Sequence, residues 1–507
     1  KNTIIMIHFN YQSQLKSNAT FSNLLLRTLN ISFFLVAFML LNLNLSAQPG
    51  SIEWEHNYGG SDGEAANDIQ TTDDGGYIIA GQSSSADGNV SGNNGGRDYW
   101  LVKLDVSGNI EWEGNYGGSG DDRAKSVQQT DDGGYIVAGE SKSNDVDVSN
   151  NNGDYDYWLV KVDSNGNIEW EDNYGGSSED FVSSIQQTDD GGYILAGRSG
   201  SDDGDVSGNN GLGDYWAVKV DSTGNIEWEN YYGGSSEDWA QSIQQTEDGG
   251  YILTGYSESN DGNVSGNNGD LDYWLLKLNA SGNILWENNY GGSSSDPASS
   301  VQQTDDGGYI VAGASNSDDG DVSLNNGSMD YWLVKIDASG NIQWENNYGG
   351  SSFDAASTVQ QTDDGGYILA GWSESDDGDV TGNNGLEDFL VVKVDSTGNI
   401  EWEENYGGSF TDEAASVVET SDGGFALAGA SNSDNGDVGG NQGDDDYWIV
   451  KINGTLSTEN PSSIGKIQSN LYPNPTRKKI TVETNRAKAP LTLILRDITG
   501  RSVSEHK

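Results

Sequence analysis

The sequence of 507 residues contains no cysteine and only three histidines, His8, His56 and His506. Disulfide scaffolds, zinc clusters, thiol nucleophiles and serine–histidine triads therefore lack their components. Basic residues are also scarce, because 24 Lys and Arg stand against 80 Asp and Glu, for a formal net charge of -56. A surface this negative repels phosphates and anionic lipid, which excludes nucleic acid as a partner and leaves carboxylates as the only groups for catalysis.

Long apolar runs are missing as well. The longest covers residues 31–41 (ISFFLVAFMLL), which is short for a membrane-spanning helix. Arg27 precedes this run and Ala47 follows it, an order typical of a secretory signal. We therefore expect residues 1–47 to be a signal peptide with an extra N-terminal leader, cleaved after Ala47 and leaving no transmembrane segment. A membrane anchor is the alternative.

Proline is rare, with 6 residues, whereas the chain has 70 glycines, 15 Trp, 24 Tyr and 10 Phe. This composition is too aromatic for a disordered chain and indicates many turns between strands. From residue 51 the sequence repeats every 58 residues, and a Tyr-Gly-Gly motif marks each unit at Tyr58, Tyr116, Tyr174, Tyr232, Tyr290, Tyr348 and Tyr406. Such a period is typical of solenoids, propellers or arrays, and the number of strands in the unit decides among them.

Each unit carries the pattern of four short strands. In the third unit these are predicted at residues 184–188, 193–197, 215–220 and 225–229, joined by turn-forming Asp, Ser, Asn and Gly. The middle strands are almost continuously apolar, as expected of strands covered on both faces, whereas the fourth alternates apolar and polar residues like an outer edge. Four antiparallel strands with tight turns make one blade of a propeller.

The two ends of the array complement each other. It begins with a fourth-strand motif at residues 52–55 (IEWE) and ends after a third strand at residues 447–452. Pairing the first strand with the last unit would close the ring and remove its open edges. We therefore predict an all-β, seven-bladed β-propeller over residues 50–455, closed by the N-terminal strand, and we expect it to be a monomer.

Two segments resemble known families. The repeat Y-G-G-S…Q-Q-T-D-D-G-G-Y-I-L-A-G…D-Y-W-L-V-K-x-D-x-x-G-N-I-x-W is similar to the tandem propeller repeats of exported Bacteroidota proteins. The tail, Leu471-Tyr472-Pro473-Asn474-Pro475 followed by residues 480–482 and 491–503, resembles the C-terminal sorting domain of the type IX secretion system, a small β-sandwich. This resemblance implies a linker at 456–470, a partial sorting domain at 471–507, and export by the type IX machinery of a Gram-negative bacterium, with release or attachment at the outer cell surface.

Two residue types recur in every unit. A tryptophan stands in each predicted fourth strand: Trp54, Trp112, Trp170, Trp228, Trp286, Trp344 and Trp402. We interpret it as a packing residue wedged against the next blade, rather than a sugar-stacking platform. An acidic residue precedes each first strand: Glu64, Asp122, Asp180, Asp238, Asp296, Asp354 and Asp412. Pairs such as Asp180 and Asp238 could serve glycoside hydrolysis. Because catalytic sites normally break symmetry, we favour a structural role for this residue, in which its carboxylate accepts hydrogen bonds from backbone N–H groups.

The connection between the second and third strands is long and acidic. Hard cations such as Ca²⁺ bind six to eight oxygen ligands on flexible loops, and this connection offers Asp and Asn at alternate positions. The candidate ligands are Asp203, Asp205, Asn209 and Asp214 in the third unit, and Asp319, Asp321, Asn325 and Asp330 in the fifth. The alternative is a solvated loop, since the same residue types also form turns.

Two positions vary freely among the units. The first follows the shared acidic residue and holds Ala65, Arg123, Phe181, Trp239, Pro297, Ala355 or Glu413. The second holds Gln82, Glu140, Arg198, Tyr256, Ala314, Trp372 or Ala430. We predict that the first lies in the entry to strand one and the second at the start of the long loop, on one face of the propeller. Loops on a rigid scaffold carry binding residues, and the candidates are Phe181, Arg198, Trp239, Tyr256 and Trp372.

The sequence thus predicts an exported, non-catalytic module that binds a glycan or another surface protein. A carboxylate-based glycan-degrading enzyme and a passive, calcium-stiffened surface module are the alternatives.

Overall fold

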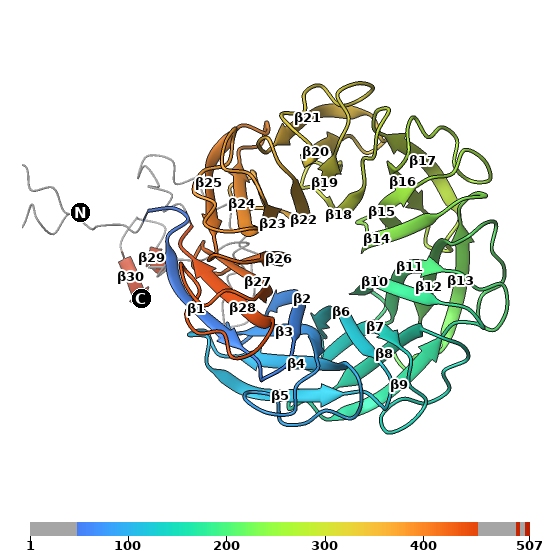
Figure 1. The fold of residues 1–507 in the computed structure, drawn as a ribbon, viewed down its shortest axis with the longest axis horizontal. Helices are drawn as coiled ribbons and strands as arrows, with labels where there is room; N and C mark the ends of the chain where they lie inside the picture. Colours follow the sequence, from blue (N-terminus) through green and yellow to red (C-terminus); the bar gives the residue numbers. More distant parts are fainter. Residues whose placement is uncertain (1–47, 455–492, 497–501, 507) are drawn as a thin grey trace, which may run out of the picture. The chain divides into compact units, whose positions relative to one another are not determined.

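The computed structural model of the chain describes residues 48–454, 493–496 and 502–506. Residues 48–454 form a ring of seven four-stranded antiparallel sheets, so the predicted seven-bladed β-propeller is confirmed (Figure 1). Within the part of the chain that the structure describes, no helix is long and apolar enough to cross a bilayer.

The third blade illustrates the common plan. Its strands are β10 (Asp180–Gln187), β11 (Tyr193–Ser199), β12 (Asp214–Val220) and β13 (Ile226–Tyr232), in that order from the centre of the ring outward. The hairpin turn between β10 and β11 places Gly191 at φ +82°, a left-handed conformation that favours glycine. β12 is buried at every position, whereas β13 is half-exposed along most of its length, as its alternating sequence predicts.

The other blades repeat this plan. Blade 1 consists of β2 (Glu64–Thr71), β3 (Tyr77–Ser83), β4 (Asp98–Leu104) and β5 (Ile110–Tyr116); blade 2 of β6 (Asp122–Gln129), β7 (Tyr135–Ser141), β8 (Asp156–Val162) and β9 (Ile168–Tyr174); blade 4 of β14 (Asp238–Gln245), β15 (Tyr251–Ser257), β16 (Asp272–Leu278) and β17 (Ile284–Tyr290). Blade 5 consists of β18 (Ala298–Gln303), β19 (Tyr309–Ser315), β20 (Asp330–Ile336) and β21 (Ile342–Tyr348); blade 6 of β22 (Asp354–Gln361), β23 (Tyr367–Ser373), β24 (Asp388–Val394) and β25 (Ile400–Tyr406).

Blade 7 contains strands from both ends of the propeller. Its strands are β26 (Asp412–Glu419), β27 (Phe425–Ser431), β28 (Asp446–Ile452) and, as the outermost, β1 (Ile52–Tyr58). β1 pairs antiparallel with β28, from Tyr58 opposite Tyr447 to Ile52 opposite Ile452. The prediction that the first fourth-strand motif closes the ring is confirmed.

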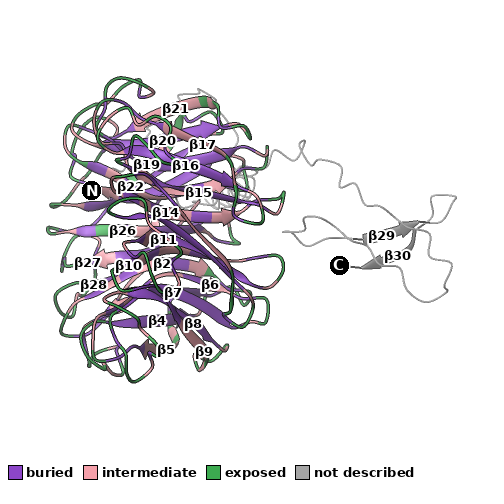
Figure 2. Ribbon diagram, turned by 90° about the vertical axis from the view of Figure 1, so that its right-hand side faces the viewer, coloured by how far each residue is buried: buried purple, intermediate pink, exposed green. Residues whose placement is uncertain are grey.

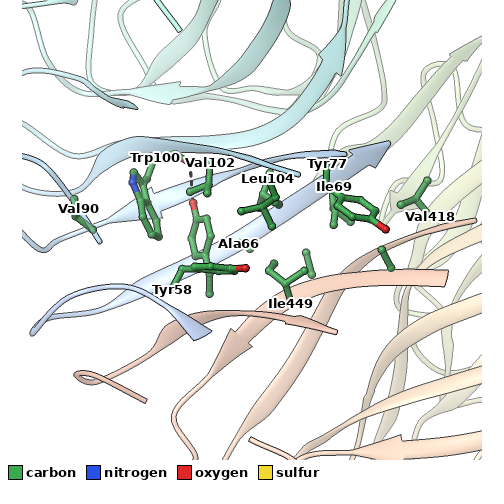
Figure 3. Packing of buried hydrophobic residues seen from close by; sticks show 14 residues of the cluster. Tyr58, Ala66, Ile69, Tyr77, Val90, Trp100, Val102, Leu104, Val418 and Ile449 are labelled. Atoms are coloured by element: carbon green, nitrogen blue, oxygen red, sulfur yellow. Dashed lines mark hydrogen bonds between the residues drawn. The ribbon is translucent and has the colours of Figure 1, made fainter. Parts of the chain in front are cut away.

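Apolar side chains fill the space between neighbouring blades. Figure 3 shows the cluster between blades 7 and 1, where Trp100, Val102 and Leu104 of β4 lie near Ile449 of β28. The second and third strands of the blades are buried along almost their whole length, whereas the innermost strands mix buried and half-exposed positions. Full exposure is concentrated in the loops (Figure 2). The recurring fourth-strand tryptophan packs on the next blade, since the ring centroid of Trp112 lies 5.7 Å from that of Tyr135. Its interpretation as a packing residue is confirmed.

Hydrogen bonds also join the blades. The hydroxyl of Tyr157 donates to the carbonyl oxygen of Trp216 in the next blade at 3.1 Å, and that of Tyr174 donates to the carbonyl oxygen of Gly224 at 2.6 Å. Buried tyrosines need such partners, which here fix each blade against its neighbour. The ring is therefore a rigid frame on which exposed side chains hold defined positions.

The chain divides after Thr455 into two compact units. In the second unit, β29 (Leu493–Arg496) and β30 (Ser502–His506) form a two-stranded antiparallel sheet. Most of the predicted sorting domain, the linker and the predicted signal peptide lie outside the described residues.

Candidate functional site

The two ends of the blades differ in sequence variability. One end, here called the loop face, carries the connections β11–β12 and β13–β14, and the other, the turn face, carries the short hairpins. The two variable positions lie at the loop face, as predicted. Both lie inside strands rather than in connections, which corrects the prediction, because the first strand begins at Asp180 and the second extends to Ser199.

The two variable positions face each other across neighbouring strands. The register pairs Phe181 with Arg198 and Trp239 with Tyr256, and the same pairing recurs for Arg123 with Glu140. Directly opposed residues in an antiparallel pair bring their side chains within contact distance. Each blade therefore presents one variable pair at the loop face, next to the mouth of the central channel.

A third variable position lines that mouth. Every first strand has a β-bulge two residues after the first variable position, for instance between Val182 and Ser184. The extra residues of six blades line a cavity of about 540 Å³: Asn67, Lys125, Ser183, Gln241, Ser299 and Ser357. Bulges re-aim side chains in this way. Our sequence reasoning missed this position, although its variability among otherwise similar units was a usable signal.

Aromatic rings from blades 2 to 4 form a continuous cluster beside the cavity. The rings of Phe181 and Trp239 are stacked, with centroids 5.6 Å apart and planes inclined by 15°. Tyr155 extends the cluster on the Phe181 side at 5.4 Å, and Tyr256 extends it on the Trp239 side at 6.4 Å. The guanidinium of Arg198 lies 5.6 Å from the Trp239 ring. Four of the five predicted binding residues are thus brought together.

Trp372 is the exception. It lies on β23 in blade 6, paired with Ala355 and Phe389, and it is not among the described residues that line the cavity. Trp372 is therefore a candidate that lies apart from the cluster of the other four. The first variable position of its blade holds Ala355, where blades 3 and 4 have the aromatic residues Phe181 and Trp239.

A charged group closes the cavity on the blade 2 side. The Glu140 side chain is only 3% exposed, and one of its oxygens lies 3.6 Å from Lys125 Nζ and 3.9 Å from Arg123 Nη1. Its other oxygen and Arg123 Nε are buried without a hydrogen-bond partner in the described part of the protein. Burial raises the pKa of Glu140, and the two cations oppose that rise. Unpaired buried polar atoms in a cavity are suited to a polar ligand.

The shared acidic residue has the structural role that we predicted. Asp180 accepts hydrogen bonds from Gly176 N–H at 2.8 Å, from the Ser201 hydroxyl at 2.9 Å, and from the Ser199 hydroxyl. Asp238 makes the same contacts in the next blade. These carboxylates hold their own blade together and are absent from the described residues that line the cavity.

Replacing Asp180 with alanine should destabilise the fold by about 2–4 kcal/mol, because three buried donors lose their acceptor. Urea denaturation measures the effect, with Glu179→Ala as a control that removes the exposed neighbouring carboxylate. Folded Asp180→Ala protein should bind ligand normally. Lost binding at unchanged stability would instead assign Asp180 to the functional site.

The predicted calcium ligands mostly accept hydrogen bonds from the backbone. Asp203 accepts from Ser177 N–H at 2.7 Å and Asp214 from Asn210 N–H at 2.7 Å, while the amide of Asn209 donates to the carbonyl oxygen of Ser199 at 3.0 Å. Asp205 accepts from Gly175 N–H at 3.3 Å. Asp319, Asp321, Asn325 and Asp330 repeat these contacts in blade 5. Among the described residues, no group of three or more Asp, Glu or His is placed to hold a metal ion.

Comparison with known protein families finds no match, and comparison with curated proteins finds none either. Similar solved structures include Sqt1 from Chaetomium thermophilum, with a TM-score of 0.40 and 12% identity over 74% of this chain and 83% of that one. They also include BamB from Moraxella catarrhalis, with a TM-score of 0.34 and 15% identity over 80% of this chain and 88% of that one.

Proposed function

We propose that this chain is an exported, surface-attached or secreted propeller that binds a glycan at the loop face without catalysis. The observation that carries this proposal is the cavity where stacked Phe181 and Trp239 lie beside Glu140 and Lys125. Aromatic faces pack against the apolar face of a sugar ring, and a buried carboxylate next to an ammonium complements its hydroxyl groups.

The carboxylates favour binding over hydrolysis. Glycoside hydrolysis normally needs two carboxyl groups on either side of the scissile bond. Glu140 is the only carboxylate among the described residues that line the cavity. Asp180 and Asp238, which the sequence offered as a catalytic pair, are each engaged in hydrogen bonds within their own blade. The described lining of the cavity therefore has the groups of a binding site and one carboxylate rather than the two of a hydrolase.

Export and surface attachment rest on the sequence. The apolar run before Ala47 and the tail from Leu471 support secretion through the type IX machinery. The first segment and most of the second lie outside the described residues, so this part of the proposal draws no support from the ring itself. Release of the protein into the medium by cells with an intact type IX system, and its retention in cells without one, would test it.

Trp239→Ala should weaken glycan binding by about 30-fold or more, because truncating a central aromatic contact typically costs about 2 kcal/mol. Trp372→Ala is the matched control, since this tryptophan also occupies a variable position of the loop face but lies outside the cluster. A glycan and protein array probed with the full chain identifies the ligand, and calorimetry then compares the variants. Equal affinities for the two variants, or an array that yields only protein ligands, would contradict the proposal.

A further inference from the structure

The basic residues that do not recur in every blade all lie on one side of the loop face. Residues 48–454 contain twelve Lys and Arg. Seven are one lysine per blade, almost fully buried and paired with an aspartate of the turn face: Lys103, Lys161, Lys219, Lys277, Lys335, Lys393 and Lys451. The other five all belong to blades 1 to 3: Arg97, Arg123, Lys125, Lys142 and Arg198. The cavity is lined by residues of six blades, and two of these five cations, Arg123 and Lys125, belong to its lining.

Most of these five cations already have an anionic partner. Arg198 pairs with Glu237, Lys142 pairs with Asp154, and Arg123 lies 3.3 Å from Asp121. Each of these three cations is thus paired with a carboxylate, and only Arg123 of the three lines the cavity.

Lys125 differs from them. The carboxylate paired with it is that of Glu140, at 3.6 Å, which is longer than the 2.7–2.9 Å of a charge-assisted hydrogen bond. An ammonium group has three donors, so Lys125 retains donors for a ligand. It is also the only charged residue among the six bulge residues that line the cavity mouth, since the others are Asn, Ser or Gln. The positive charge of Lys125 therefore lies on the blade 2 side of the cavity mouth. The rings of Phe181 and Trp239 lie beside it, in blades 3 and 4.

The net charge of the chain does not prevent an anionic ligand from binding here. Charges are screened over about 8 Å at physiological ionic strength, so the carboxylates of distant blades act weakly at the cavity. The charged residues among the described lining of the cavity are Lys125, Arg123 and Glu140, and Arg123 is also paired with Asp121. The unpaired Nε of Arg123 is a further donor on the same side.

Building on the proposed function, we infer that the cavity selects glycans that carry an anionic substituent, a carboxylate or a sulfate ester. Lys125 binds this group while the sugar ring packs against Phe181 and Trp239. Glu140 accepts hydrogen bonds from neighbouring hydroxyl groups and keeps the ammonium of Lys125 in place.

The test uses the full chain and glycan pairs that differ only in charge. Oligomers of galacturonate, glucuronate and mannuronate are each compared with their methyl esters, and sulfated oligosaccharides with their desulfated forms, by calorimetry. We expect about tenfold tighter binding of the acid in at least one pair, a difference that shrinks as salt is added. The pair that shows it distinguishes a carboxylate ligand from a sulfate ligand.

Lys125→Gln should abolish this preference, so that acid and neutral partner bind with equal affinity. An unfolding midpoint in urea equal to that of the unmodified protein shows that the variant is folded. Lys142→Gln is the matched control, because it removes an exposed rim cation paired with Asp154, and it should keep the preference. Equal binding of acid and ester by the unmodified protein would overturn the inference but leave the proposed function standing. A preference that survives in Lys125→Gln would overturn the role of Lys125. The absence of binding to every glycan would overturn the proposed function itself.

Discussion

A chain that begins at residue 59 should lose at least about 5 kcal/mol of its unfolding free energy relative to one that begins at residue 48. The deletion removes β1, which is the outermost strand of blade 7. Trp54 and Tyr58 then no longer cover the cluster between blades 7 and 1, and each large apolar side chain contributes about 1.5–3 kcal/mol on burial. The hydrogen bonds between β1 and β28 are lost as well, and β28 becomes an open edge.

Urea unfolding followed by tryptophan fluorescence measures this loss. The chain that begins at residue 48 is the control, since it lacks the predicted signal peptide but keeps the closing strand. We also expect the shortened protein to associate through its exposed edge, which light scattering detects. A chain from residue 59 that unfolds at the same urea concentration as the control would show that β1 is dispensable for closure.

The propeller should be more stable near pH 5 than near pH 8. Each blade has a buried aspartate at the start of its third strand whose carboxyl group meets the shared acidic residue of the next blade. Burial is the main cause that raises its pKa, to about 7 in Asp98, Asp156 and Asp272 and to about 6 in Asp214, Asp330, Asp388 and Asp446. In each of the seven, one carboxylate oxygen is buried without a hydrogen-bond partner among the described residues.

Proton linkage determines the direction in which stability changes with pH. The pKa of these groups is 3.8 when unperturbed, so the folded state holds their protons more tightly than the unfolded state does. Stability is therefore highest when the groups are protonated, falls as the pH rises from about 4 to about 7, and stays low above that range. Other carboxylates determine how far the pH can fall before stability decreases again. Burial tends to raise the pKa of Asp74, but hydrogen bonds from Thr72 and Gly76 and the ammonium of Lys103 lower it to about 2, so its contribution is lost below about pH 4.

Asp156→Asn isolates one of the seven groups. The asparagine can still accept the hydrogen bond from Asn152 N–H that Asp156 accepts at 2.6 Å, and it carries no charge. We expect the variant to be more stable than the unmodified protein at pH 8, by about 1 kcal/mol, and this difference to be smaller at pH 5. The exposed Asp189→Asn should change stability at neither pH. If Asp156→Asn were destabilising at pH 8, the buried carboxylate would be a net contributor to the fold.

The convergence of these carboxylates also explains a recurring glycine. A Cβ atom on Gly175 would overlap the carboxylate oxygens of Asp156 and Asp180, so only glycine leaves both in place. The second glycine of the Tyr-Gly-Gly motif meets a different obstacle, since a Cβ on Gly176 would overlap Asp203 and Ser201 of the long loop. The motif that reveals the repeat in the sequence is thus a consequence of close packing between the blades.

The sequence by itself determined the architecture. A period of 58 residues, four strand patterns per unit and a displaced fourth-strand motif at residues 52–55 are sufficient to predict seven blades and their closure. They are sufficient because strand pairing and turn formation within a blade depend on residues close together in the chain. Seven copies of the unit also support the same assignment of strands and turns. The role of Asp180 could be predicted in the same way, since a residue present in every blade is expected to stabilise the structure of the blade.

Only the tertiary structure decided which variable residues form a site. Trp239 and Trp372 are both variable aromatic residues in the sequence. In the structure Phe181 of the neighbouring blade stacks on Trp239, whereas Trp372 is paired with Ala355 of its own blade. Lys125 becomes a cavity residue because a bulge turns it toward the channel. The raised pKa of Asp156 likewise depends on its burial and on the carboxylate of Asp180 in the next blade. Such contacts arise between separate units, and no pattern within one unit encodes them.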